Sequence, residues 1–157
     1  MRRYIILAVG KPKEPWQKQA ILEYKKRLTA FAKLEIQAFP EGHGGAKKPD
    51  VHKTRTVESK SLLASLPEDS LVIALDETGK NLSSEAFAKH IEKEGETGRS
   101  ITFLLGGSWG LSEGIRKRAD LVLSFGKETL PHILARIVLL EQIYRAETIL
   151  KGKLYHK

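Results

Sequence analysis

The sequence predicts an α/β fold in which a mostly parallel sheet is flanked by helices. Five short apolar runs alternate with segments of helical character along the 157 residues, an order typical of parallel sheets whose crossovers are helices. The runs at 4–10 and 71–76 are continuously apolar, as expected for strands buried on both faces. A chain of this length is expected to form one domain, residues 1–157.

Residues 4–39 predict a strand, a helix and a second strand. Tyr4–Gly10 (YIILAVG) is the first strand. Pro15 opens the helix, because proline suits a first helical turn. Leu34–Phe39 is the second strand, and Pro40 ends it. The helix is expected to bury a single apolar stripe, made of residues three or four positions apart: Trp16, Ala20, Tyr24, Leu28 and Phe31.

Glu41–Asp50 is predicted to be a flexible loop, because it holds three glycines, one proline and two adjacent lysines. Each flank is too short to fold alone, so we do not interpret this loop as a domain boundary. A polar helix from about His52 to Leu66 comes next, and Pro67 stops it. The leucines expected to dock its end are Leu62, Leu63 and Leu66.

The second half of the chain continues the alternation. Leu71–Asp76 is a buried strand followed by a turn at Glu77–Lys80. Ser83 is expected to cap the next helix, which ends at Gly95 and Gly98. The remaining elements are a strand at 101–107, a short helix at 111–119, a strand at Leu121–Gly126 and a helix from Pro131 to about Gly152.

The composition favours a basic cytoplasmic protein. Lys and Arg number 27 against 19 Asp and Glu, a net charge of +8, which attracts polyanions such as nucleic acid; a merely basic solvated surface is the alternative. Cysteine is absent, which excludes disulfides, thiol catalysis and zinc–thiolate sites. No apolar run approaches the roughly 20 residues of a membrane span, and the apolar start is too short for a signal peptide. We expect no membrane partner and no bound metal.

The last helix predicts a homodimer. Its apolar residues fall on more than one stripe, whereas a surface helix of a monomer keeps one face polar. Because little chain remains to cover the second stripe, we expect a second copy to pack against this helix. The apolar positions are 133, 134, 137, 138, 139, 140, 143, 144, 149 and 150.

The stretch Gly106-Gly107-Ser108-Trp109-Gly110 matches G-x-S-x-G, the nucleophile elbow of serine hydrolases. Nominal partners for Ser108 exist. However, Asp120 directly precedes a strand, and glycines at 110 and 114 weaken the helix that an elbow feeds. The other interpretation is that the glycines let a backbone approach something closely. A serine hydrolase remains an alternative. The nominal partners are Asp120 or Glu128, then His132 or His156.

Three loops are expected to meet at the carboxyl edge of the sheet, where ligands gather in open α/β folds. They are LDETGK (75–80), the glycine stretch at 106–110, and SFGKETLPH (124–132). Neither a P-loop nor a G-x-G-x-x-G fingerprint occurs, so classical nucleotide-binding folds lose support. The loops predict a pocket built from backbone, with few charged side chains.

These stretches together resemble the small SPOUT methyltransferases. The likeness is carried by VIALDETGK, FLLGGSWGLS, LSFGKETLPHILARIVLLEQIYRA, the opening ILAVGK and the terminal LYHK, so it spans the whole chain. Within SPOUT proteins it is similar to the RlmH family, which methylates N3 of a pseudouridine in large-subunit (23S) ribosomal RNA. The resemblance implies a C-terminal trefoil knot that binds S-adenosylmethionine mainly through loop backbone, with Ser108 as a loop residue. The cofactor-binding residues it implies are Leu75, Gly106, Phe125, Gly126, Lys127, Glu128, Thr129 and Leu130.

The resemblance also implies a proton to be removed from N3 of the acceptor, and Arg136, Tyr155 and His156 are the candidate catalytic residues. Arg136 either pairs with Glu141 of a partner chain or lies near the acceptor and favours the deprotonated base. Tyr155 is suited to stacking on a base and His156 to accepting a proton or contacting phosphate; a frayed basic end is the alternative. His132 is expected to cap or pack, because the helix dipole disfavours its charged form.

RNA binding is expected to come from the sum of several basic residues and to depend on salt, although each alone is more often a solvated charge. The chain shows no appended RNA-binding domain, so the assembled ribosome is the expected substrate. A basic RNA-binding protein without catalysis remains an alternative. The candidate phosphate contacts are Lys47, Lys48, Lys53, Arg55, Arg116, Lys117 and Arg118.

Overall fold

The protein has the predicted α/β architecture in a computed structural model that describes residues 1–157. Five parallel strands form one sheet in the order β2-β1-β4-β3-β5. The elements are β1 (Arg2–Val9), α1 (Pro15–Leu28), β2 (Ala32–Phe39), α2 (Val51–Ala64), β3 (Ser70–Asn81), α3 (Ser84–Gly95), β4 (Ser100–Leu105), α4 (Glu113–Arg118), β5 (Leu121–Ser124) and α5 (His132–Leu150).

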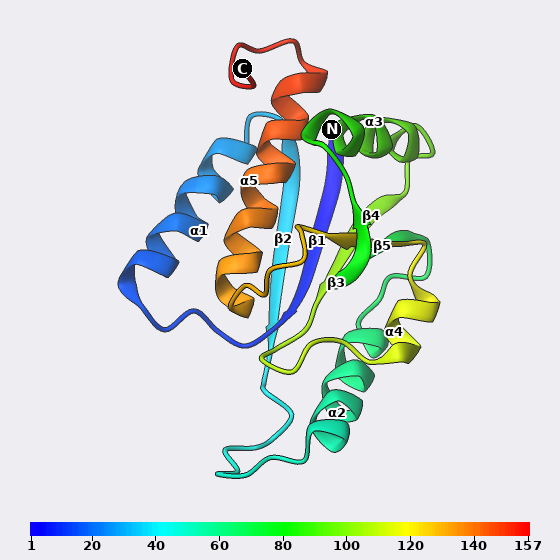
Figure 1. The fold of residues 1–157 in the computed structure, drawn as a ribbon. Coiled ribbons are helices and arrows are strands. Elements are labelled where there is room, and N and C mark those ends of the chain that lie inside the picture. Colours follow the sequence, from blue (N-terminus) through cyan, green and yellow to red (C-terminus); the bar gives the residue numbers. More distant parts are fainter.

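The sheet is the middle of three layers (Figure 1). Helices α1, α3 and α5 pack on one face, and α2 and α4 pack on the other. Strand β1 serves both cores: Tyr4, Ile6 and Ala8 face the first, while Ile5 and Leu7 face the second. The continuous apolar run at 4–10 therefore reflects burial on both faces, as predicted. No helix combines the length and the hydrophobicity that a membrane span requires.

Strand β3 does not end at Asp76, and the predicted turn at Glu77–Lys80 is wrong. These residues form a bulge within the strand. Leu123 of β5 pairs with both Leu75 and Lys80, and the residues between these two bulge out of the strand. The Asp76 carboxylate stabilises the bulge by accepting a hydrogen bond from Thr78 N at 3.0 Å. A Cβ on Gly79 would lie 2.5 Å from the Val122 carbonyl oxygen, so only glycine allows the chain to return to β5 here.

The predicted apolar stripe of α1 is wrong at its first member. Trp16 is 53% exposed, and the fully buried residues of this helix are Ile21 and Leu28. At the end of α2, Leu62 is buried as predicted, but Leu63 is on the surface. Spacing alone identifies a helical face, but only the positions of neighbouring elements decide how far along the helix that face is covered.

Helix α5 is only partly covered within its own chain, because Leu134, Ile137 and Val138 stay half-buried. Helix α1 packs on one side and α3 on the other. The Tyr144 ring lies 5.8 Å from that of Phe31, edge to face. Two intramolecular neighbours therefore explain part of the apolar surface of this helix. The homodimer stays a prediction.

Two buried polar contacts fix α5 along β1. Near its carboxyl end, Glu147 is fully buried and accepts hydrogen bonds from Tyr4 Oη at 2.5 Å and from Arg2 Nη1 at 3.1 Å. Burial, and next the Glu147 charge, raise the pKa of Tyr4, so its hydroxyl stays a donor. Near the other end, Arg136 Nη2 donates to the carbonyl oxygens of Val9 and Gly10 at 3.1 and 2.8 Å. The helix start is thereby held at the carboxyl end of β1.

Candidate functional site

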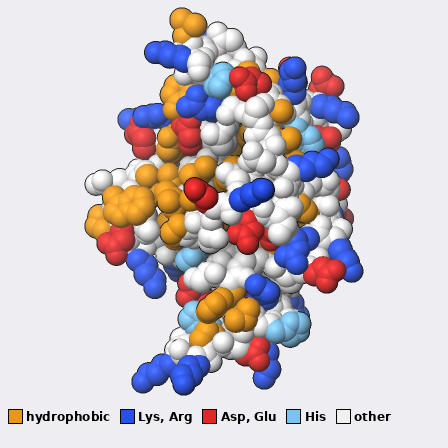
Figure 2. All heavy atoms as spheres, viewed as in Figure 1, with side chains coloured by type: hydrophobic (Ala, Val, Ile, Leu, Met, Phe, Trp, Pro, Cys, Tyr) orange, Lys and Arg blue, Asp and Glu red, His pale blue; other side chains and the backbone are white.

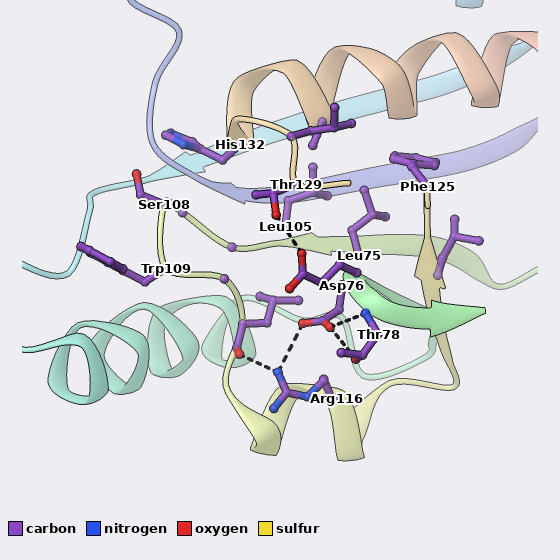
Figure 3. Close-up of a pocket in the computed structure, with 18 of the residues that line it drawn as sticks. Leu75, Asp76, Thr78, Leu105, Ser108, Trp109, Arg116, Phe125, Thr129 and His132 are labelled. Carbon is purple, nitrogen blue, oxygen red and sulfur yellow. Dashed lines mark hydrogen bonds and ion pairs between the residues drawn. The ribbon is translucent and has the colours of Figure 1, made fainter. Parts of the chain in front are cut away.

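A cavity of about 500 Å³ lies at the carboxyl edge of the sheet. The bulge of β3 and the loops after β4 and β5 form its walls together with the first turn of α5 (Figure 3). This volume is within the usual range of small-molecule sites. The three loops expected from the sequence to meet do meet there. The implied cofactor residues that line the cavity are Leu75, Gly106, Phe125, Gly126, Glu128, Thr129 and Leu130.

Lys127 is the exception among those residues, because it does not line the cavity and is exposed. The chain turns tightly just before it, where Ser124 Oγ accepts a hydrogen bond from Gly126 N at 3.0 Å. An ammonium group keeps its hydration by remaining on the surface. The structure therefore gives Lys127 no part in the cavity.

The glycines of the 106–110 loop allow the protein backbone to pack on itself. A Cβ on Gly106 would lie 2.6 Å from the carbonyl carbon and oxygen of Gly110. Gly107 and Gly110 form an isolated bridge, and Gly110 has φ = +77°, a conformation that favours glycine. The glycines do allow a close backbone approach, as expected. At Gly106 the group that comes close is the Gly110 backbone of the same loop. This packing closes the 106–110 loop, and the closed loop forms a wall of the cavity.

One wall of the cavity is more charged than predicted. Arg116 Nη1 lies 3.3 Å from Asp76 Oδ2 and donates to the Leu111 carbonyl oxygen at 2.9 Å (Figure 3). Burial alone would raise the pKa of Asp76, but hydrogen bonds from Thr78 and the Arg116 guanidinium outweigh it and lower that pKa. Asp76 is thus an ionised carboxylate, and Arg116, a candidate phosphate contact, is its ion-pair partner.

His132 lines the cavity at the start of α5. Its Nε2 lies 3.9 Å from Glu41 Oε1. Burial is the main reason that the pKa of His132 is lowered, and the nearby Arg136 adds to it while Glu41 opposes it. The neutral imidazole is favoured, as the sequence predicted, although burial is the largest cause of the shift.

Arg136 binds backbone carbonyls of its own chain, and its two predicted arrangements stay predictions. Its side chain is only 2% exposed and has no carboxylate partner. Glu141 instead pairs with Arg145 at 2.7 Å. Burial lowers the pKa of Arg136 to about 10, so the guanidinium remains charged. Arg136 lies one turn behind His132 and is not among the residues that line the cavity.

The C-terminal tail folds back on α3 and α5, away from the cavity of its own chain. Tyr155 Oη donates to Glu141 Oε2 at 2.8 Å. His156 Nδ1 lies 3.2 Å from Arg145 Nη1 and its Nε2 lies 2.7 Å from Glu85 Oε1. Because arginine only donates, Nε2 carries the proton that binds Glu85. Glu141 is about 13 Å further along α5 than His132, at about 1.5 Å per residue.

Ser108, Glu128 and His132 line the same cavity, but no hydrogen bond joins Ser108 to a candidate acid or histidine of a hydrolase triad. Asp120 accepts a hydrogen bond from Val72 N at 2.8 Å, and each candidate histidine contacts a glutamate, His132 with Glu41 and His156 with Glu85. The elbow interpretation therefore lacks the hydrogen-bonded relay that activates a serine. The structure also contains no cluster of three or more His, Cys, Asp or Glu side chains that could hold a metal ion.

Comparison with known proteins identifies the family. Residues 2–156 match the family described as "Predicted SPOUT methyltransferase". The chain belongs to the SPOUT methyltransferases. It is 48% identical to the "Ribosomal RNA large subunit methyltransferase H" of Carboxydothermus hydrogenoformans, 46% to that of Listeria welshimeri and 45% to that of Lactobacillus acidophilus. Each alignment covers 97% of this chain and 98% of the relative. The resemblance inferred from the motifs is confirmed.

Family membership assigns a reaction class to the edge cavity. A SPOUT methyltransferase transfers a methyl group and therefore needs a donor. The cavity at the three loops is the candidate donor site of this SPOUT protein.

Glu58 is a buried carboxylate beside this site that sequence reasoning missed. It is 3% exposed, and its Oε2 accepts a hydrogen bond from Gly42 N at 2.9 Å, while Oε1 has no partner. A Cβ on Gly107 would lie 3.2 Å from Oε2, so Glu58 packs under the glycine loop. Burial raises the pKa of Glu58, and the Gly42 hydrogen bond only partly offsets it.

We expect Gly106→Ala to lower the free energy of unfolding by about 1–3 kcal/mol, because the added methyl overpacks against the Gly110 backbone. The matched control is Gly114→Ala in α4, where the nearest atom to the new Cβ is Ser112 Oγ at 3.8 Å. That variant should gain about 0.4–1 kcal/mol from lost unfolded-state entropy. Urea unfolding measures both. Equal effects of the two substitutions would contradict the close packing.

We expect Glu58→Gln to gain stability relative to the wild type as the pH rises. The pKa of Glu58 is higher in the folded than in the unfolded chain. Between these two pKa values the folded state binds more protons, so the wild type loses stability as the pH rises through that window. Glutamine is neutral throughout. Urea unfolding at about pH 4 and about pH 8 measures the difference, with exposed Glu35→Gln as the control. An identical Glu58→Gln effect at both pH values would disprove the shift.

Proposed function

We propose that this chain is an S-adenosylmethionine-dependent methyltransferase of large-subunit ribosomal RNA that modifies N3 of a pseudouridine. The observation that carries the proposal is a three-loop cavity in a SPOUT chain whose relatives at 45–48% identity are named for large-subunit ribosomal RNA methylation. The RlmH resemblance supplies the base and the atom. It also supplies a trefoil knot, a cytoplasmic location and the assembled ribosome as substrate, which we include in the proposal.

The cavity lining suits this cofactor. Leu75, Phe125 and Leu130 give apolar surface, and the loop backbones provide amides and carbonyls that recognise an adenosine without added charge. When bound, the cofactor supplies a methyl group on a positively charged sulfur. The carboxylates of Asp76 and Glu128 line the same cavity and favour a cation there. The residues that would hold the cofactor are those of the three loops, without Lys127.

His132 is suited to handling the acceptor's proton. Its imidazole lines the cavity, and burial keeps it neutral and able to accept a proton. Arg136 is a positioning residue in this proposal, since it holds the start of α5 through the Val9 and Gly10 carbonyls. A buried guanidinium in that position cannot itself contact the acceptor.

Tyr155 and His156 act, in our proposal, on the cavity of a second copy. Within one chain they are held at Glu141 and Glu85, away from the cavity. A two-fold dimer through α5 presents the same surface of each copy to the other. With the two α5 helices antiparallel, the tail of each copy lies toward the cavity end of its partner. This retains the homodimer through α5 that was expected from the sequence.

Transfer of the labelled methyl group from S-adenosylmethionine to ribosomes tests the activity. Purified protein should label a pseudouridine of large-subunit ribosomal RNA, and mapping of the methylated base identifies it. Ser108→Ala should retain the rate, because the candidate acid Asp120 and both candidate histidines have other partners than Ser108. Calorimetry that detects no stoichiometric S-adenosylmethionine binding would indicate an RNA-binding protein without catalysis. Labelling of Ser108 by a fluorophosphonate would indicate a hydrolase.

Mixing two inactive variants tests the shared site. Leu130→Trp fills the cavity, and deletion of 155–157 removes the tail. Each variant alone should be inactive. After unfolding and joint refolding, random pairing should recover roughly a quarter of wild-type activity, because half of the dimers then hold one complete site. Gel filtration checks that both variants dimerise. A mixture that stays inactive would show that the tail acts on its own chain.

A further inference from the structure

Trp109 is an aromatic side chain at the cavity that the proposed chemistry leaves unused. It lines the cavity and is 40% exposed. Figure 3 shows it on the loop between β4 and α4, near Ser108 and on the side of the cavity where His132 lies. The inner walls come from less exposed residues such as Leu105 and Leu123. The indole therefore belongs to the mouth of the cavity.

Two hydrogen bonds hold the backbone around Trp109. Gly110 N donates to the Gly107 carbonyl oxygen at 3.1 Å, which closes the turn. From α2, Arg55 Nε donates to the Trp109 carbonyl oxygen at 2.6 Å. The indole itself enters none of the aromatic pairs of the chain. A large aromatic ring on a fixed turn, partly exposed and without an aromatic neighbour, is preorganised to contact a ligand.

The surroundings of Trp109 are basic. Arg55 is exposed, and the loop and first turn that precede it add further exposed cations. In the lower part of Figure 2, Lys, Arg and His side chains, with some Asp and Glu side chains among them, surround a group of hydrophobic atoms. An aromatic face among cations is the recognition surface of single-stranded nucleic acids, because bases stack while cations bind the phosphates. The exposed cations and histidine are Lys47, Lys48, His52 and Lys53.

We propose that Trp109 stacks on an unpaired base of the RNA substrate that flanks the target base, at the mouth of the cavity. Arg55 is the positioning residue that holds the stacking loop. The inference rests on the proposed function and specifies how its substrate is selected: the target lies in an unpaired segment, since a base within a duplex has no free face for the indole.

The chain contains two tryptophans, which makes a direct test available. Trp16→Phe leaves Trp109 as the only indole. Single-stranded oligouridylate should quench its emission saturably, whereas S-adenosylmethionine alone should not. Quenching by the cofactor alone would assign the indole to the donor site and overturn the proposal. Emission that RNA leaves unchanged would also overturn it.

Oligonucleotide affinity and KM for ribosomes, measured in variants of each tryptophan separately, give a second test. Trp109→Ala should weaken binding of the oligonucleotide, and raise KM for ribosomes, by about five-fold or more, the lower range for loss of one stacked base. Trp109→Phe should recover part of the loss. Trp16→Ala is the matched control, since Trp16 is exposed but outside the cavity lining. An unimpaired Trp109→Ala enzyme would refute the stacking and leave the methyltransferase standing, whereas a wild type that methylates no RNA would refute the proposed function itself.

Discussion

The site depends on the buried guanidinium of Arg136, whose hydrogen-bond partners are backbone carbonyls and not a carboxylate. Arg136 donates to Val9 and Gly10 at the carboxyl end of β1, and Glu147 holds the far end of the same helix to Tyr4. Loss of either partner would leave a buried polar group unsatisfied. With both in place, α5 cannot slide along β1, and His132 is brought to the cavity.

Backbone packing at the sheet edge then gives the cavity its walls. Gly106 packs against Gly110 and Gly79 against Val122, at distances that no Cβ would allow. A wall made of backbone offers amides and carbonyls at fixed positions and little side-chain freedom. The glycines that let the chain close here therefore also leave backbone amides and carbonyls available to a small molecule.

Charge is divided between the inside and the outside of the site. Asp76 and Glu128 line the cavity, while exposed cations gather on the loop and first turn of α2 beside Trp109. A cationic methyl donor is attracted by negative charge, whereas a polyanionic acceptor is attracted by positive charge. Arg116 neutralises part of the acidic wall through Asp76, so the cavity keeps a carboxylate lining without an unpaired buried charge.

Local sequence was sufficient for the α/β class, the presence of five strands, the Ser83 cap and the loops after β4 and β5, because periodicity and turn residues express local backbone preferences. It missed that residues 77–80 form a bulge within β3. Motifs in combination identified the family. Tertiary structure alone decided that α1 and α3 partly cover α5, that Trp16 is exposed, and that the tail binds Glu141 and Glu85. Arg136 and Val9 are 127 positions apart. Which distant groups meet depends on how whole elements pack, and no local pattern encodes that.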